Sequence, residues 1–208
     1  WKFSTFAGIT NSFGSINDLY NGFILLSAKN LSAKNTDIQQ TKSNFVGSRL
    51  EYRNPLNNIF FNVSYNFNDR TSNITYLNKL NVDSQQFILE GYNLENNSKT
   101  NSARTELGKY FPKLKTNASV GYNYSLSNYQ QLPANSTPTE SSFIDVEGRN
   151  QGVSVKFNNN YFSWLSVDYN ANWSFSKTQS PDDSDFNNQT DLFNHALSAY
   201  VYPFKNHT

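Results

Sequence analysis

Residues 59–67 read IFFNVSYNF, a stretch in which apolar and polar side chains alternate. Apolar residues occupy every second position from Ile59 to Phe67, and Asn62, Ser64 and Asn66 lie between them. Successive side chains of an extended strand point to opposite sides. The pattern therefore predicts a strand with one apolar and one polar face, and the rest of the sequence must decide which face meets water.

Two later stretches repeat this pattern. Residues 118–126 read ASVGYNYSL and residues 165–175 read LSVDYNANWSF, with apolar side chains again on one parity. Helical periodicity is weak, and the many Asn, Ser, Thr and Tyr residues disfavour helices, so we predict an all-β protein. Its strongest strands place these side chains on the apolar face: Ile59, Phe61, Val63, Tyr65, Phe67, Val120, Tyr122, Tyr124, Leu165, Val167, Tyr169, Trp173 and Phe175.

The composition indicates what the apolar face meets. Only 16% of the 208 residues are charged, whereas 37% are hydrophobic and 33 are Asn. A soluble domain of this length normally carries more charge on its surface. The net charge of +1 creates no field that would attract nucleic acid. The lack of cysteine excludes disulfides and thiolate chemistry.

Short and long connections are expected to alternate along the chain. Tight turns are expected at 54–57, 111–115, 158–162 and 203–206. Long polar connections are expected at 29–41, 78–85, 129–143 and 178–190. About eight strands remain: 1–28, 33–53, 58–77, 85–111, 115–130, 143–158, 163–178 and 190–204. This order predicts hairpins with short turns at one end and long loops at the other.

Such a pattern is typical of an outer-membrane β-barrel. From Leu165 to Phe175 the strand advances about 33 Å, which projects to roughly 25 Å at a tilt near 40°, the height of the apolar band of such barrels. Aromatic residues flank the tight turns, where an interfacial girdle is expected: Tyr52, Phe60, Phe61, Tyr110, Phe111, Tyr161, Phe162 and Trp164. We therefore predict a transmembrane, antiparallel, up-and-down barrel with its aromatic face in lipid and its Asn- and Ser-rich face in a wet lumen.

Three stretches carry a family resemblance. They are residues 52–76 (YRNPLNNIFFNVSYNFNDRTSNITY), 103–132 (ARTELGKYFPKLKTNASVGYNYSLSNYQQL) and 162–180 (FSWLSVDYNANWSFSKTQS). In the residue patterns of its strands and turns the chain resembles the barrel region of TonB-dependent receptor-like outer-membrane proteins of Bacteroidetes. The resemblance implies the outer membrane of a Gram-negative bacterium, and a barrel of about 22 strands around a plug. The implied partners are outer-membrane lipid, the remaining strands and plug of the same protein, a surface lipoprotein and a periplasmic energy-coupling protein.

No plug, energy-coupling box or terminal aromatic residue is recognisable between WKFSTFAG at the start and KNHT at the end. We therefore expect residues 1–208 to be an interior segment of one larger barrel domain, with the plug and the terminal regions outside it.

Six charged side chains are expected to face the lumen: Arg49, Glu51, Arg104, Glu106, Lys156 and Asp168. They could pair with one another, contact a plug or line a solute path, and a structural network across neighbouring strands is the simplest of these uses. Arg49 and Glu51 are not expected to be nearest neighbours of Arg104 and Glu106, because the strand 58–77 lies between them.

The sequence offers little other chemistry. His195 and His207 have no acidic or His neighbour at ligand spacing. The acidic stretch with Asp182, Asp183 and Asp185 lacks the order of a calcium loop. No catalytic motif occurs, so we expect neither a cofactor nor an enzyme activity.

Three functions stay open: a segment of a solute-uptake barrel, a barrel that acts as a scaffold in an outer-membrane assembly, and a soluble secreted β-sandwich that binds carbohydrate through exposed Tyr and Trp.

Overall fold

The computed structural model describes residues 1–15, 22–27, 29–33, 36–81, 85–133, 137–139, 142–181 and 187–202. Its strands are β1 (Lys2–Phe13), β2 (Phe23–Ser27), β3 (Asn30–Ala33), β4 (Gln40–Asn54), β5 (Ile59–Ser72), β6 (Thr75–Asn81), β7 (Gln86–Tyr92), β8 (Asn96–Phe111), β9 (Thr116–Gln131), β10 (Ile144–Phe162), β11 (Leu165–Gln179) and β12 (Asn188–Val201). A short 3-10 helix, η2 (Pro112–Leu114), links β8 to β9. The prediction of an all-β protein is confirmed.

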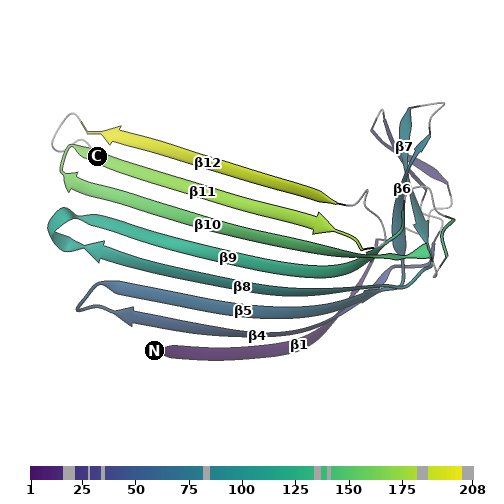
Figure 1. Ribbon diagram of the computed structural model, residues 1–208, viewed down its shortest axis with the longest axis horizontal. Helices are drawn as coiled ribbons and strands as arrows, with labels where there is room; N and C mark the ends of the chain where they lie inside the picture. Colours follow the sequence, from purple (N-terminus) through teal and green to yellow (C-terminus); the bar gives the residue numbers. More distant parts are fainter. Residues whose placement is uncertain are drawn as a thin grey trace.

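Eight long strands form one antiparallel sheet, the main sheet, in the order β1-β4-β5-β8-β9-β10-β11-β12. Figure 1 shows them side by side as a single curved layer. The predicted number of long strands is therefore correct. In the described part of the chain the sheet does not close on itself, because β1 and β12 each pair with one strand only.

The short connections lie together at one end of the main sheet, the turn end (Figure 1). In the β4–β5 turn, the side-chain oxygen of Asn54 accepts hydrogen bonds from the backbone N–H groups of Leu56 (3.0 Å) and Asn57 (3.2 Å), which is the usual way that Asn closes a turn. The turn predicted at 158–162 is wrong. A bulge lets β10 continue to Phe162, and the chain reverses at residues 163–164. The turn predicted at 203–206 lies outside the described residues.

At the opposite end, the loop end, two of the predicted long connections and parts of the strands predicted beside them fold into a second sheet, the small sheet (Figure 1). Its strand order is β2-β3-β7-β6, and the parallel pairing of β3 with β7 joins two connections that are distant in sequence. The strands predicted at 1–28, 58–77 and 85–111 are therefore too long. Each belongs partly to the main sheet and partly to the small sheet, because the chain leaves the main ladder after Phe13 and Ser72 and joins it again only at Asn96.

The strand register gives the main sheet two unlike faces. Paired residues lie on the same face, and one ladder row crosses all eight strands through Phe3, Leu50, Val63, Thr105, Tyr122, Val153, Trp173 and Phe193. All the side chains predicted for the apolar face share this face. The row also fixes the facing of the last strand, which the sequence left open, because Phe193 pairs with Trp173.

No second layer covers the apolar face in the described part of the chain. Side chains such as Leu107 (54% exposed), Trp173 (48%) and Leu197 (68%) remain open to the surroundings. The chain exposes 14273 Å², whereas a globular protein of 23.8 kDa exposes about 9,900 Å². The fully buried hydrophobic side chains among the described residues are Ile74, Leu77, Leu132 and Val146. Ile74, Leu132 and Val146 lie at or beside the loop end of the main sheet and Leu77 in β6, so the core is small and lies away from the apolar face.

Aromatic rings on the polar face lie over glycines of neighbouring strands. Phe60 pairs with Gly108 and Phe6 with Gly47, and a Cβ atom at either glycine would collide with the ring. These positions need glycine because of the close approach of the ring. Phe60 and Tyr110, both expected in the interfacial girdle, thus belong to the polar face, whereas Tyr52, Phe61 and Phe111 lie on the apolar face.

Candidate functional site on the polar face

The six charged side chains predicted to face the lumen share the polar face of the main sheet, and we call them the charged belt (Arg49, Glu51, Arg104, Glu106, Lys156 and Asp168). Arg49 and Arg104 both pair with Ser64, from the two sides of β5. Glu51 and Glu106 flank Asn62 in the same way. As expected, β5 separates the two charged pairs.

Three hollows border the charged belt. Arg49 and Arg104 line one of about 360 Å³, Lys156 and Asp168 line a second of about 360 Å³, and Arg104 and Lys156 line a third of about 230 Å³. Each pair of hollows has one of these lining residues in common: Glu106 for the first and second, Arg104 for the first and third, and Lys156 for the second and third. The three hollows therefore adjoin one another. They exist because the side chains between the charges are small, namely Ser64, Ser119, Gly121 and Ser154.

The charged belt makes few internal contacts. Nε of Arg49 lies 2.8 Å from Oε1 of Glu51, along the same strand, and the side chain of Asn158 donates a hydrogen bond to Asp168. Arg104, Glu106 and Lys156 form no ion pair with another described residue. The charged belt therefore does not form a network of ion pairs across the strands of the main sheet. A buried charge without a partner would be costly, so these groups need water or a polar partner in the hollows.

The other candidates from the sequence do not form a site. His195 lies on the apolar face, with its ring 5.5 Å from that of Phe193 and 6.3 Å from that of Tyr169. His207 and the acidic stretch with Asp182, Asp183 and Asp185 lie outside the described residues. Among the described residues there is no group of three or more His, Asp or Glu side chains that could hold a metal ion.

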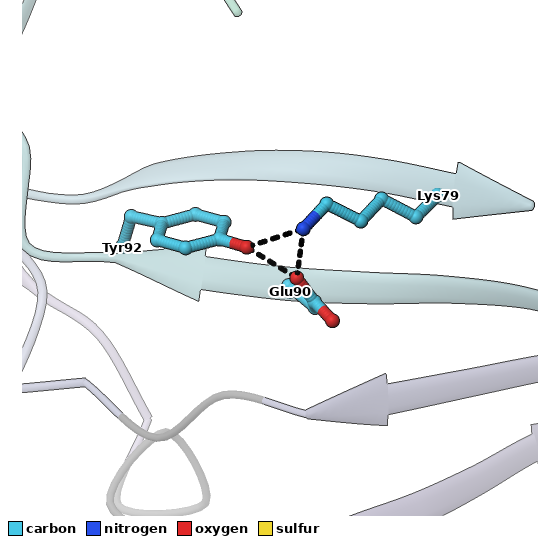
Figure 2. Close-up of polar contacts among 3 residues, drawn as sticks. All are labelled: Lys79, Glu90 and Tyr92. Atoms are coloured by element: carbon cyan, nitrogen blue, oxygen red, sulfur yellow. Dashed lines mark hydrogen bonds and ion pairs between the residues drawn. The ribbon is translucent and has the colours of Figure 1, made fainter. Parts of the chain in front are cut away.

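A second polar cluster lies on the small sheet, which the sequence analysis did not predict. Figure 2 shows Lys79 of β6 pointing toward Glu90 and Tyr92 of β7. Nζ of Lys79 lies 2.8 Å from Oε2 of Glu90 and donates a hydrogen bond of 2.9 Å to the Tyr92 hydroxyl, which itself donates to Glu90. Neither TYLNKLN (75–81) nor QFILEGY (86–92) alternates regularly between apolar and polar residues, so local periodicity gives no signal for this hairpin.

These contacts shift the ionisation of all three groups. The hydrogen bond to Glu90, and then that to Tyr92, raise the pKa of Lys79 above 10.5. Burial would raise the pKa of Glu90, but the hydrogen bonds from Lys79 and Tyr92 together outweigh burial and lower it below 4.5. Burial and the hydrogen bond to Glu90 raise the pKa of Tyr92 above 10.0. The cluster therefore holds the charged forms of Lys79 and Glu90.

No model of a known protein family matches the chain, and no curated protein is similar to it in sequence. The described residues contain no helix that is long and apolar enough to cross a membrane. Fold and site thus define a β-rich protein with long antiparallel strands, an amphipathic main sheet and a charged belt on its polar face.

Proposed function

We propose that this chain is a segment of a transmembrane β-barrel in the outer membrane of a Gram-negative bacterium, similar to TonB-dependent receptors, and that the barrel takes up a solute. One observation carries the proposal: the main sheet is a single layer with an uncovered apolar face and a polar, charged face. Such a sheet needs an apolar solvent on one side and water or a polar partner on the other.

The height of the apolar face supports a membrane as that solvent. On β5 the apolar positions run from Ile59 to Phe67 and are followed by Asp69; on β11 they run to Phe175 and are followed by Lys177. Runs of eight to ten residue steps advance about 26–33 Å, or roughly 20–25 Å along the membrane normal at a tilt near 40°. This matches the apolar band of an outer-membrane barrel.

The two edges of the main sheet favour a larger barrel. Backbone groups on the free sides of β1 and β12 would be unpaired in lipid, which membrane proteins do not tolerate. We therefore propose that further strands of the same protein pair with both edges. The small side chains and hollows of the polar face fit a wide, wet lumen or the surface of a plug better than the packed interior of a small barrel.

The charged belt has three residues of each sign, so it would attract neither anions nor cations over a long range. It suits a neutral, hydroxyl-rich or zwitterionic solute that exchanges hydrogen bonds along a wet path. In this proposal a plug and a periplasmic energy-coupling protein control passage, and a surface lipoprotein covers the loop end.

Single cysteines can test which solvent each face meets, because the protein has no cysteine of its own. A fluorophore at Val120 or Tyr122 should be quenched by nitroxide-labelled lipid, whereas a fluorophore at Ser119 or Asn123 should be quenched by iodide from the aqueous phase. Quenching that does not alternate with residue parity, in the protein reconstituted in vesicles, would contradict the proposal.

A scaffold in an outer-membrane assembly is the second candidate. The observation that favours it is the folded small sheet, which exposes Leu25 (64%), Leu26 (61%), Leu80 (55%) and Phe87 (49%). Replacement of residues 75–92 by a short Gly- and Ser-rich turn should abolish association with a partner and spare uptake if the small sheet serves only for docking. If uptake is lost while the barrel still folds, the small sheet serves the transport function.

A further inference from the structure

Two cations face each other directly on the apolar side of the main sheet. Arg149 of β10 pairs with Lys177 of β11, and both share a face with Trp173 and Phe175. They are the first charged residues that follow the apolar positions of these strands toward the loop end. Like charges directly opposite each other destabilise a sheet, so this pair needs a counter-charge.

The described residues supply only part of that counter-charge. Oε1 of Glu147 lies 3.1 Å from Nη2 of Arg149 and also accepts a hydrogen bond of 3.3 Å from the side chain of Gln179. Nε of Arg149 is buried and has no hydrogen-bond partner in the structure. Lys177 forms no ion pair with another described residue.

The remaining acidic groups of the neighbouring strands do not change this balance. Asp191 of β12 shares the face of the pair, two residues closer to the turn end, and accepts a hydrogen bond from the indole of Trp173. Asp145 lies further toward the loop end on β10. One carboxylate, that of Glu147, thus contacts the pair, and an unpaired donor remains on Arg149.

An open groove of about 660 Å³ adjoins the pair on its loop-end side. Glu147 and Gln179, which contact each other beside Arg149, also line this groove. Its other walls carry amide and carboxylate groups from Asn97, Asn128, Gln130 and Asp145 and the ammonium group of Lys99. Such groups hydrogen-bond the hydroxyls of sugars.

Three surfaces therefore follow one another along β10 and β11: an apolar surface, a cation pair and a groove rich in hydrogen-bonding groups. We propose that they bind one molecule of a phosphorylated glycolipid of the outer leaflet. Arg149 and Lys177 hold its phosphate, the groove receives its sugar, and the apolar face lies against its acyl chains. This inference rests on the proposed membrane location.

The phosphate balances the positive charges of Arg149 and Lys177. It accepts hydrogen bonds from Nε of Arg149 and from the ammonium group of Lys177, and charge-assisted hydrogen bonds of this kind are among the strongest in proteins. The anion also replaces the repulsion between two cations by two attractions.

The test measures binding of lipid A to the full-length protein in non-ionic detergent by native mass spectrometry, with phosphatidylcholine as the comparison lipid. Wild type should bind lipid A in preference. Lys177→Gln and the double variant Arg149→Gln/Lys177→Gln should bind it at least about tenfold more weakly. The control Arg53→Gln/Lys113→Gln removes two cations near the turn end and should bind as wild type does.

A charge reversal separates ligand binding from a structural role. Lys177→Glu places an anion opposite Arg149, so it should raise the urea midpoint of the lipid-free protein and still abolish the preference for lipid A. A role in folding alone would change the midpoint without affecting lipid selectivity.

Each outcome is decisive. Equal lipid A binding by wild type and by Lys177→Gln overturns the inference while the protein remains a membrane protein. Equally tight binding of soluble glucosamine 1-phosphate shows a site for free sugar phosphates, which also overturns it. A protein that stays in solution without detergent refutes the membrane location itself, and the partition between detergent and water shows this before any lipid is added.

Discussion

Substitution of Val63 by Arg should strongly destabilise the protein in a bilayer. Val63 lies midway along the apolar positions of β5, four residues from Ile59 at one end and four from Phe67 at the other. Four steps correspond to about 13 Å along the strand, or roughly 10 Å of depth at a tilt near 40°. Val63 pairs with Leu50 on one side and Thr105 on the other, so no acidic side chain lies opposite it on either neighbouring strand.

At this depth an arginine on the lipid face costs about 2–4 kcal/mol, which lowers the folding equilibrium constant roughly 30- to 700-fold. Asn62→Arg, one residue away, is the matched control. Its new cation would lie on the polar face between Glu51 and Glu106, so we expect a change within about 0.5 kcal/mol. Ser64→Arg is a poorer control because Ser64 lies between Arg49 and Arg104.

Urea titration of the full-length protein in vesicles, followed by the heat-modifiable gel shift, gives the free energy of unfolding of each variant. Ile59→Arg, near the turn end, should cost less than Val63→Arg because the penalty falls to about 0–1 kcal/mol near the interface. Equal losses for Val63→Arg and Asn62→Arg would refute the conclusion that the two faces meet different solvents.

Three further predictions follow from the topology and from the small sheet. Tags inserted near Asn135 or Asp183 should be labelled on intact cells, whereas tags near Asn57 or Lys113, at the turn end, should not; equal labelling would contradict the orientation. Residues 1–208 alone should not refold in detergent into a heat-modifiable monomer, since β1 and β12 would keep unpaired edges; a stable monomeric barrel would disprove this. The protection factors of β6 and β7 against hydrogen exchange should fall at both pH extremes. The lowered pKa of Glu90 provides stability above pH 4.5 that is lost on acidification through the folded value, and the raised pKa of Lys79 provides stability below pH 10.5 that is lost as the pH rises through its folded value. Glu90→Gln should remove the acid limb, and an unchanged limb would assign it to another group.

The sequence predicts the main sheet well because its strands are long and alternate with a period of two. One parity is apolar over 59–67, 118–126 and 165–175, and a register slip of one residue would exchange the two faces. The register that forms keeps every such run on the same face. The facing of β12 was not predictable because both of its parities carry apolar side chains, and only the pairing of Phe193 with Trp173 decides it.

The small sheet was not predicted because its pairing is tertiary. Its strands have only four to seven residues; β2 and β7 lie within longer predicted strands, β3 lies in a predicted loop, and β6 crosses the boundary between a predicted strand and a loop. The parallel contact of β3 with β7 depends on the main sheet, which brings two loops of distant sequence to one end. Short strands of this kind obtain their stability from partners that a local pattern does not reveal.

The charged belt adds an argument that periodicity alone could not give. Small side chains separate Arg104, Glu106 and Lys156, so each lies in a hollow and none forms an ion pair with another described residue. A packed soluble core would leave such groups desolvated, and lipid would do so even more. The polar face can therefore be stable only against water or a polar partner, whereas the opposite face is stable only against an apolar medium. The wall of a membrane pore requires such a single-layer sheet between two different surroundings. This agreement supports the proposed function independently of the family resemblance.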